Sequence, residues 1–309
     1  MSLPAVHHDP SLPERVTIYE VGARDGLQNE SGVIPLATKR EFVQRLTVAG
    51  LPVVEATSFV HPKWVPQLAD AADLVAALDL HGPTPYPVLV PNERGLDRAL
   101  EAGVTHVAIF GSATETFASK NLNSTYEDQF AMFEPVVRRA LDAGVKVRAY
   151  LSMCFGDPWE GEVALDRVVT AGERLLGMGA YELSLGDTIG VGTAHHVEAL
   201  LDAFGEAGVG VDRLAMHFHD TYGQALANTY AALRHGVTTF DASAGGLGGC
   251  PYAKSATGNL ATEDLVWMLD GLGIAHGVDL PALAQTSVWM AEQLGCPSPS
   301  AVVRALTAG

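Results

Sequence analysis

The sequence predicts an α/β protein, a single (β/α)8 TIM barrel with additional C-terminal helices. Its 309 residues suffice for one large domain with a full core. Eight strand-then-helix units follow one another, each of roughly 20–40 residues, the size of a βα repeat. Several predicted helices end at a glycine followed by an apolar residue that starts the next strand, as at 49–51, 102–104, 143–145 and 235–237. Count and alternation favour a closed barrel, with an open doubly wound sheet as the alternative.

The predicted strands are short runs rich in β-branched and apolar residues. They occupy residues 15–21, 52–58, 86–90, 105–110, 145–152, 181–185, 214–219 and 237–242. Helical spacing of apolar residues follows each strand. The helices are predicted at 36–48, 69–80, 93–102, 125–143, 162–178, 195–204, 224–235 and 262–272.

The intervening and C-terminal segments complete a single domain over residues 1–309. Residues 111–123 are predicted to form a long connection, and residues 245–258 a glycine-rich loop. No composition break or linker interrupts the barrel core, which spans about residues 15–275. We expect one or two extra helices at 279–305, packed on the barrel.

Composition excludes several classes of partner. The formal net charge is −17, whereas binding to nucleic acid or to an anionic membrane requires a basic surface. No apolar run approaches the ~20 residues of a membrane span, and residues 1–14 resemble neither a signal nor a transit peptide. The three cysteines, Cys154, Cys250 and Cys296, are few and far apart, which indicates reduced thiols and a cytoplasmic location.

Two histidines, His217 and His219, stand one residue apart in the seventh predicted strand. Side chains along a strand alternate between its faces, so these two share a face and are close enough to hold one ion. They lie near the carboxyl end of the strand, where barrel enzymes bind ligands. A pair of structural or surface histidines is the alternative explanation.

Other polar residues are predicted at the same rim of the barrel. Each alone has a structural explanation, such as a turn cap for Asp25, an arginine partner for Glu55 or a helix N-cap for Asp187. Together they point to a functional site, because burying charges is costly and stability alone would not gather them there. The candidates are Arg24, Asp25, Glu55, Ser58, Tyr150, Ser152, Ser184, Asp187, Thr188, His217, His219, Asp220, Cys250, Lys254 and Asn259.

Four of these residues are candidate metal ligands: Asp25, His217, His219 and Asn259. Two imidazoles, a carboxylate and an amide oxygen suit an octahedral divalent ion such as Mg²⁺ or Mn²⁺. Zinc is the lesser alternative, because it prefers four tight ligands and an amide oxygen is a poor one.

The glycine-rich segment 245–252 carries Cys250. A phosphate cradle is disfavoured, since the spacing differs from GxxxxGK[ST] and no helix follows directly. We expect a mobile flap that brings Cys250 over the site as a general acid or base. The alternative is a buried cysteine that acts as a small apolar side chain.

The motifs of this chain resemble those of the 3-hydroxy-3-methylglutaryl-CoA (HMG-CoA) lyase family, within a wider group of metal-dependent lyases and synthases on a (β/α)8 barrel. The resemblance covers about residues 16–264 and rests on residues 21–30 (VGARDGLQNE), 55–66, 184–190, 217–223 and 245–264. Ala23, Met153, Asp157 and Ser255 depart from the family pattern, which bears on loop kinetics and acyl-chain preference.

The resemblance implies metal-dependent cleavage of HMG-CoA to acetyl-CoA and acetoacetate. Asp25, His217, His219 and Asn259 would hold the metal, and His217 or Asp25 would help to remove the proton of the tertiary hydroxyl. Arg24 would stabilise the enolate oxygen. Glu55 would orient Arg24 or the metal ligands, and Cys250 would protonate the carbanion. The substrate-binding residues implied are Gln28, Ser58, Asn121, Tyr150, Ser184 and Asp187.

The implied partner is a small acyl-CoA substrate, with Lys63 and Lys254 as candidates for contact with the CoA phosphates. A lyase for a longer 3-hydroxy-3-acylglutaryl-CoA, or a Claisen-type synthase or aldolase on the same barrel, is the alternative enzyme. A non-catalytic metal- or CoA-binding scaffold is a third hypothesis, which the complete set of rim residues disfavours. A homodimer through the C-terminal helices is a further expectation.

Overall fold

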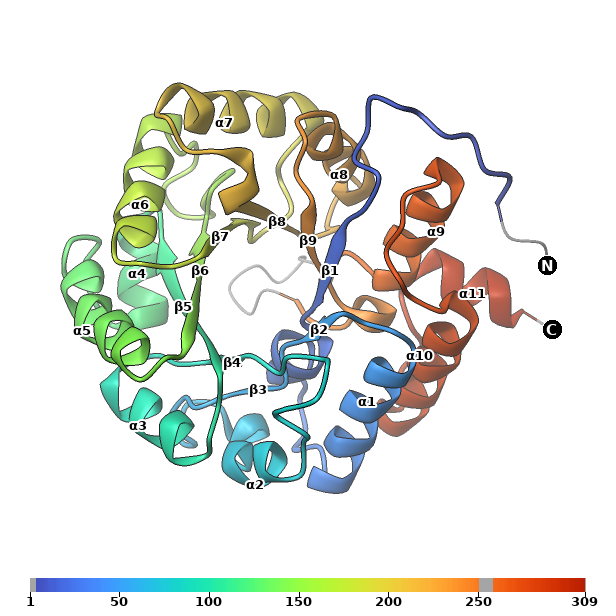
Figure 1. Cartoon of the computed structure of the whole chain (residues 1–309), viewed down its shortest axis with the longest axis horizontal. Coiled ribbons are helices and arrows are strands. Elements are labelled where there is room, and N and C mark those ends of the chain that lie inside the picture. The colour runs from blue at the N-terminus through green and yellow to red at the C-terminus, as the bar shows by residue number, and fades with distance from the viewer. Residues whose placement is uncertain (1–3, 250–257, 309) are drawn as a thin grey trace.

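A computed structural model describes residues 4–249 and 258–308, and it confirms the barrel (Figure 1). Its strands all pair in parallel, in the order β2-β1-β9-β8-β7-β6-β5-β4-β3. The strands are β1 (Thr17–Glu20), β2 (Val53–Val54), β3 (Thr57–Ser58), β4 (Val88–Leu89), β5 (His106–Ser112), β6 (Lys146–Ser152), β7 (Glu182–Asp187), β8 (Leu214–Phe218) and β9 (Thr239–Ala242).

The barrel closes through the predicted strand 52–58, which is divided into β2 and β3. β2 pairs with β1, and β3 pairs with β4. Between them, the backbone N–H of Glu55 donates to the carbonyl of Glu20, and that of Ala56 donates to the carbonyl of Pro87. One segment therefore bonds to the first strand on one side and to the third predicted strand on the other, so nine strands fill eight positions.

Helices surround the strands on the outside of the barrel, as Figure 1 shows. They are α1 (Leu36–Val48), α2 (Ala71–Ala76), α3 (Glu93–Glu101), α4 (Glu115–Leu122), α5 (Asp128–Asp142), α6 (Leu165–Gly177), α7 (Ala194–Glu206), α8 (Ala225–Arg234), α9 (Thr262–Leu272), α10 (Leu280–Leu294) and α11 (Ala301–Thr307). Short 3-10 turns lie at Pro66–Leu68, Val211–Arg213 and Ala244–Gly246.

The helix α4 contradicts the prediction that residues 111–123 form only a connection. The helix is short, and only Phe117 and Ala118 of its side chains are buried, so it has too few apolar positions to show a helical period. It ends at Asn123 in the left-handed conformation, with φ 51°, and not at a glycine like the neighbouring helices.

The C-terminal helices α10 and α11 confirm the expected addition to the barrel. They lie beside α1 and α9 in Figure 1. The guanidinium of Arg45 on α1 lies 4.7 Å from the ring centre of Trp289 on α10. The hydroxyl of Ser300 donates to Asp264 on α9 at 2.7 Å. These contacts join α10 to α1, and the start of α11 to the first turn of α9.

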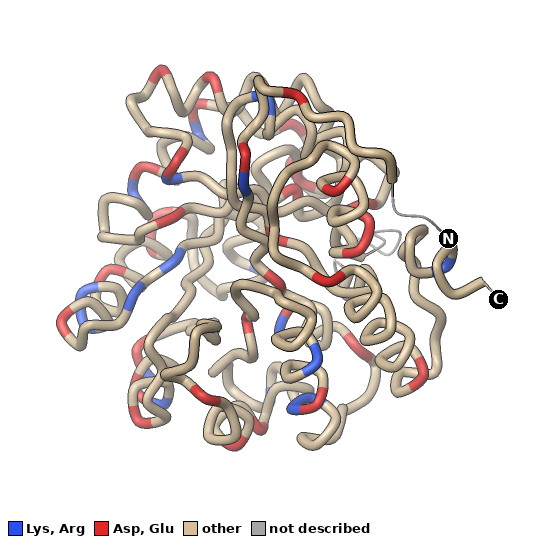
Figure 2. The backbone as a smooth tube through the Cα atoms, turned by 45° about the vertical axis from the view of Figure 1, so that its right-hand side comes forward, with Lys and Arg blue, Asp and Glu red and all other residues tan. Residues whose placement is uncertain are grey.

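Acidic residues are spread over the outer helices and loops (Figure 2), in keeping with the net charge of −17. The apolar core lies between the strands and the surrounding helices, and it includes Phe42, Phe133, Phe204 and Phe240, all fully buried. Among the described residues, no helix has the length and apolar character needed to cross a membrane.

Candidate active site

The segment after β1 forms a single turn of π-helix, Gly22–Gly26. The backbone N–H groups of Arg24, Asp25 and Gly26 all approach the carbonyl of Val21, at 3.1, 2.7 and 3.2 Å. A Cβ atom on Gly22 would lie 2.6 Å from the Glu20 carboxylate, so the turn requires glycine there. Such turns are frequent at functional sites, and this one presents Arg24 and Asp25 at the mouth of the barrel.

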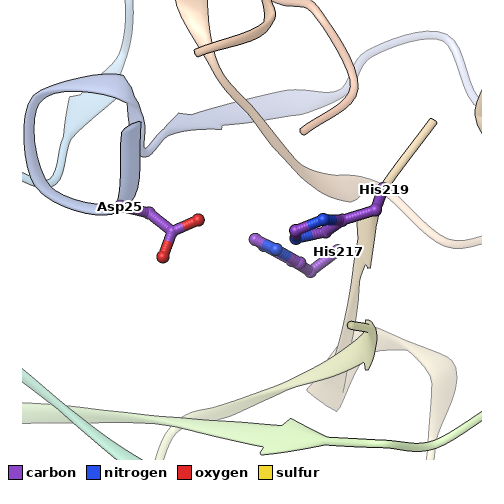
Figure 3. A group of neighbouring side chains, drawn as sticks. All are labelled: Asp25, His217 and His219. Atoms are coloured by element: carbon purple, nitrogen blue, oxygen red, sulfur yellow. The ribbon is translucent and has the colours of Figure 1, made fainter. Parts of the chain in front are cut away.

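Asp25, His217 and His219 converge on one point, as Figure 3 shows. Each offers one ligand atom, and these atoms lie within 4.8 Å of one another. His217 lies in β8, and His219 is the first residue after this strand. The centres of their rings are 5.3 Å apart. The two histidines do share a face, and the triad is a candidate site for a metal ion.

Asn259 lies beside this triad through backbone pairing with His219. Its amide nitrogen donates to Asp25 at 2.9 Å, whereas its amide oxygen is buried and has no hydrogen-bond partner among residues 4–249 and 258–308. His219 Nδ1 is also buried, and it too has no partner in the described part of the chain. Buried polar atoms without partners are costly in a folded protein, and a cation bound at this point would satisfy such acceptors. The nitrogen and oxygen ligand atoms of these residues therefore fit a divalent ion.

Arg24 connects the metal position to a second carboxylate. Its Nε donates to Glu55 and its Nη1 to Asp25, both at 2.7 Å. The hydroxyl of Tyr150 also donates to Glu55, at 3.0 Å. Nη2 of Arg24 has no hydrogen-bond partner among residues 4–249 and 258–308, so this donor is available to a ligand.

Burial and neighbouring charges raise the pKa of some of these groups and lower the pKa of others. Burial raises the pKa of Glu55, against the opposing effect of Arg24. Burial also acts to raise the pKa of Asp25, but Arg24 and the two histidines outweigh it and lower that pKa overall. Burial, with His217 close by, lowers the pKa of His219 to about 4, so His219 is neutral near pH 7, as a metal ligand must be.

The predicted substrate-binding residues occupy different environments. The hydroxyl of Ser184 donates to the buried Asp241 at 2.7 Å. Both carboxylate oxygens of Asp187 accept backbone N–H groups, from residues 191 and 192, and so order the loop after β7. Asn121 is exposed on α4, in the connection after β5.

The remaining candidates divide between the described and the undescribed parts of the chain. Ser58 is buried and accepts the N–H of Val60, and Gln28 is half-buried just after the π-helical turn. Lys63 is exposed. Cys250 and Lys254 lie outside the described residues, so their roles stay predictions.

Among the buried charged residues that the sequence did not single out, four contact the segments that carry the site: Glu20, Arg148, Asp241 and Glu263. Arg148 donates to both carboxylate oxygens of Asp241, which lies 3.2 Å from His217 Nδ1. Burial acts to raise the pKa of Asp241, but Arg148 and His217 outweigh it and hold the pKa at about 2. For Arg148 and Asp241, the indication in the sequence is a charged residue inside a predicted strand that is mainly apolar.

Glu20 joins the two segments that carry the predicted catalytic groups. Its carboxylate accepts the backbone N–H groups of Gly22 and Ala244, both at 2.8 Å, and the hydroxyl of Thr262 at 2.6 Å. Glu263 accepts the N–H of Gly245 at 2.8 Å. Burial raises the pKa of Glu20 to about 7 and that of Glu263 to about 8. The turn that begins the glycine-rich segment is thus fixed by two buried carboxyl groups.

The fold and the site define a TIM-barrel enzyme class with a candidate divalent-metal centre at the carboxyl ends of the strands, beside a buried arginine. The HMGL-like family model matches residues 15–289. The chain belongs to the HMGL-like family.

Several relatives are similar over almost the whole chain. A mitochondrial hydroxymethylglutaryl-CoA lyase from Rattus norvegicus is 50% identical over 295 residues, which cover 96% of this chain and 90% of that protein. The crystal structure of hydroxymethylglutaryl-CoA lyase from Pseudomonas aeruginosa has a TM-score of 0.93 and 46% identity, covering 96% of this chain and 99% of that one. An HMG-CoA lyase from Acinetobacter baumannii, solved in complex with coenzyme A and 3-methylmalate, has a TM-score of 0.90 and 33% identity, covering 97% of both chains.

Proposed function

We propose that this protein cleaves HMG-CoA to acetyl-CoA and acetoacetate with a bound Mg²⁺ or Mn²⁺. The observation that carries the proposal is the convergence of Asp25, His217 and His219 within 4.8 Å, beside Arg24, in a member of the HMGL-like family. The family's relatives are named as lyases for this substrate. An acyl-CoA partner is also supported by the relative solved with coenzyme A.

Asp25, His217, His219 and Asn259 are the residues that would hold the metal. Once bound, a divalent ion would act as a Lewis acid that lowers the pKa of the substrate's tertiary hydroxyl. Imidazole and oxygen donors without thiolates favour Mg²⁺ or Mn²⁺ over zinc.

Two of the candidate metal ligands, Asp25 and His217, are the groups that we propose as acceptors of the hydroxyl proton. Arg24 and Asn259 both donate to Asp25, and the low pKa of this carboxyl makes it a weak base. His217 donates through Nδ1 to the carboxylate of Asp241, so Nε2 is the ring nitrogen that would bind the metal. Asp25 and His217 therefore both stay candidates for the proton acceptor.

Loss of the hydroxyl proton breaks the bond between C2 and C3 of the substrate. The hydroxyl becomes the ketone of acetoacetate, and the bonding electrons form the enolate of acetyl-CoA. The unpartnered Nη2 of Arg24 is the donor that would stabilise the enolate oxygen. We propose, from the sequence, that Cys250 then protonates C2, which completes acetyl-CoA.

The experiment is a product analysis with the purified protein, Mg²⁺ and one substrate at a time. With HMG-CoA we expect equal amounts of acetoacetate and acetyl-CoA, and a lower kcat/KM with a longer 3-hydroxy-3-acylglutaryl-CoA. Net condensation of acetyl-CoA with a keto acid, with no cleavage of HMG-CoA, would identify a synthase and contradict the proposal. A homodimer and a cytoplasmic location stay predictions from the sequence.

A further inference from the structure

The barrel interior contains a buried ion pair that is connected to the candidate metal position through His217. Arg148 on β6 and Asp241 on β9 are both almost completely buried. Nη2 of Arg148 donates to Oδ1 of Asp241 at 2.7 Å, and Nη1 donates to Oδ2 at 3.2 Å. Oδ2 of Asp241 also lies 3.2 Å from Nδ1 of His217. The carboxylate of Asp241 thus links a buried cation to a candidate metal ligand.

We propose that Arg148 and Asp241 form a positioning unit that holds the ring of His217 with Nε2 directed to the metal position. The carboxylate of Asp241 accepts a hydrogen bond donated by Nδ1–H of His217, which leaves Nε2 without a proton and able to bind a cation. This inference rests on the proposed role of His217 as a metal ligand.

The sheet register brings the unit together. Asp241 is the direct neighbour of His217 on the adjacent strand and of Tyr19 on the other side. Ser184 on β7 donates to the same oxygen of Asp241 that faces His217, at 2.7 Å. Side chains from three other strands, β6, β7 and β8, therefore contact one carboxylate, and its direction toward the histidine follows from strand pairing.

Arg148 is itself held on several sides. Its Nε donates to Glu182 at 2.6 Å, and the ring centre of Tyr19 lies 4.0 Å from its guanidinium carbon. Its guanidinium therefore has little freedom to move away from Asp241. This rigidity is what a positioning role requires, since a metal ligand must be held close to its productive geometry.

Stability alone accounts poorly for this pair. Apolar side chains of similar volume often replace a buried ion pair at no cost in stability, whereas losing one partner is strongly destabilising. The pair also faces the metal position through His217, not the surrounding helices. A purely structural role predicts no effect on metal affinity in a folded variant, and a positioning role predicts a large one.

Asp241→Asn tests the proposal directly. The amide keeps the size of the side chain but offers one acceptor oxygen, while Arg148, Ser184 and His217 all approach as donors. An amide nitrogen facing His217 would favour the tautomer with the proton on Nε2, which cannot bind a cation. Asp70→Asn is the matched control, because it removes a carboxylate from the buried Lys39 far from this unit.

The measurement is the Mn²⁺ dissociation constant of the substrate-free protein, followed by electron paramagnetic resonance of free Mn²⁺. We expect Asp241→Asn to weaken Mn²⁺ binding by about 10–100-fold, the usual effect of losing a hydrogen-bond partner of a metal ligand. Asp70→Asn should stay within about twofold of the wild type, since Asp70 is not linked to the ligands. Circular dichroism and thermal unfolding of the metal-free proteins check that each variant folds.

A milder substitution keeps the test decisive if Asp241→Asn fails to fold. Ser184→Ala removes one donor to Asp241 and should weaken Mn²⁺ binding by a smaller factor, about two- to fivefold. If Asp241→Asn folds and its Mn²⁺ affinity is unchanged, the positioning role is overturned. If only Ser184→Ala folds, unchanged Mn²⁺ affinity in that variant overturns it. Neither result would contradict the proposed metal site. If His217→Ala bound Mn²⁺ as tightly as the wild type, the proposed metal site itself would fail, and this inference with it.

Discussion

Replacing Arg24 with methionine separates the structural from the catalytic contribution of this residue. Its side chain is 8% exposed and donates to Glu55, which is 0% exposed, and to Asp25. Among the described residues, Glu55 without Arg24 would retain only the Tyr150 hydroxyl as a hydrogen-bond partner, and one of its oxygens already lacks a partner there. Removal of one member of a buried ion pair costs about 3–5 kcal/mol in the free energy of unfolding, and we expect Arg24→Met to fall in that range at pH 7.

The double variant Arg24→Met/Glu55→Gln removes the unpaired charge. Because a neutral amide can still accept from Tyr150, we expect it to recover most of the stability that Arg24→Met loses. Activity should not recover, since the donor to the enolate oxygen stays absent. A loss of about 10²–10³-fold in kcat is expected for both variants, as for a missing oxyanion donor.

The assays are urea unfolding followed by circular dichroism, and the rate of acetoacetate formation. Arg139→Met is the control, because its ion pairs with Glu93 and Asp97 are exposed and should contribute little to stability. If the double variant were as unstable as Arg24→Met, the unpaired Glu55 would not be the cause. If the double variant regained wild-type kcat, Arg24 would have no direct catalytic role.

Three further predictions concern separate parts of the site. Glu263 has a pKa of about 8 in the folded protein, whereas its ordinary value is 4.5. Between these two pH values the folded state therefore binds more protons than the unfolded state. As a result, the free energy of unfolding falls by up to ~1.4 kcal/mol per pH unit as the pH rises. Glu263→Gln should show a shallower decline of the unfolding midpoint from pH 5 to 8, and an unchanged slope would contradict this. Cys250→Ala should lose most of kcat yet bind Mn²⁺ normally; near wild-type turnover would remove its role as proton donor. Asn259→Ala should weaken Mn²⁺ binding by isothermal titration calorimetry, and equal affinity would exclude it as a ligand.

The barrel could be predicted because its determinants are local. Apolar spacing, β-branched runs and glycine helix ends each appear within a few residues, and they recur eight times. The helix α4 could not, because it has few buried positions and ends at Asn123, not at glycine. The division of strand 52–58 into β2 and β3 depends on its neighbours at Glu20 and Pro87, which are distant in the sequence.

The metal ligands could be predicted because the topology of a barrel brings strand ends to one rim. That rule predicts that Asp25 and the two histidines lie together. The roles of Arg148 and Asp241 could not be predicted, because they depend on contact across the barrel interior between β6 and β9, which are not neighbours in the sheet. The direction of a side chain after its strand is equally non-local, which is why the prediction did not reveal that Asp187 bonds to its own loop.

The most direct test of metal-dependent cleavage at this site is a titration of the metal-stripped protein with Mn²⁺ while acetoacetate formation from HMG-CoA is followed. We expect no product before addition, and activity that rises with the bound metal and saturates at one Mn²⁺ per chain. Asp25→Ala and His219→Ala, which remove two of the three converging ligands, should bind Mn²⁺ weakly and stay inactive. Full activity in the metal-stripped protein, or undiminished activity in both variants, would contradict the account.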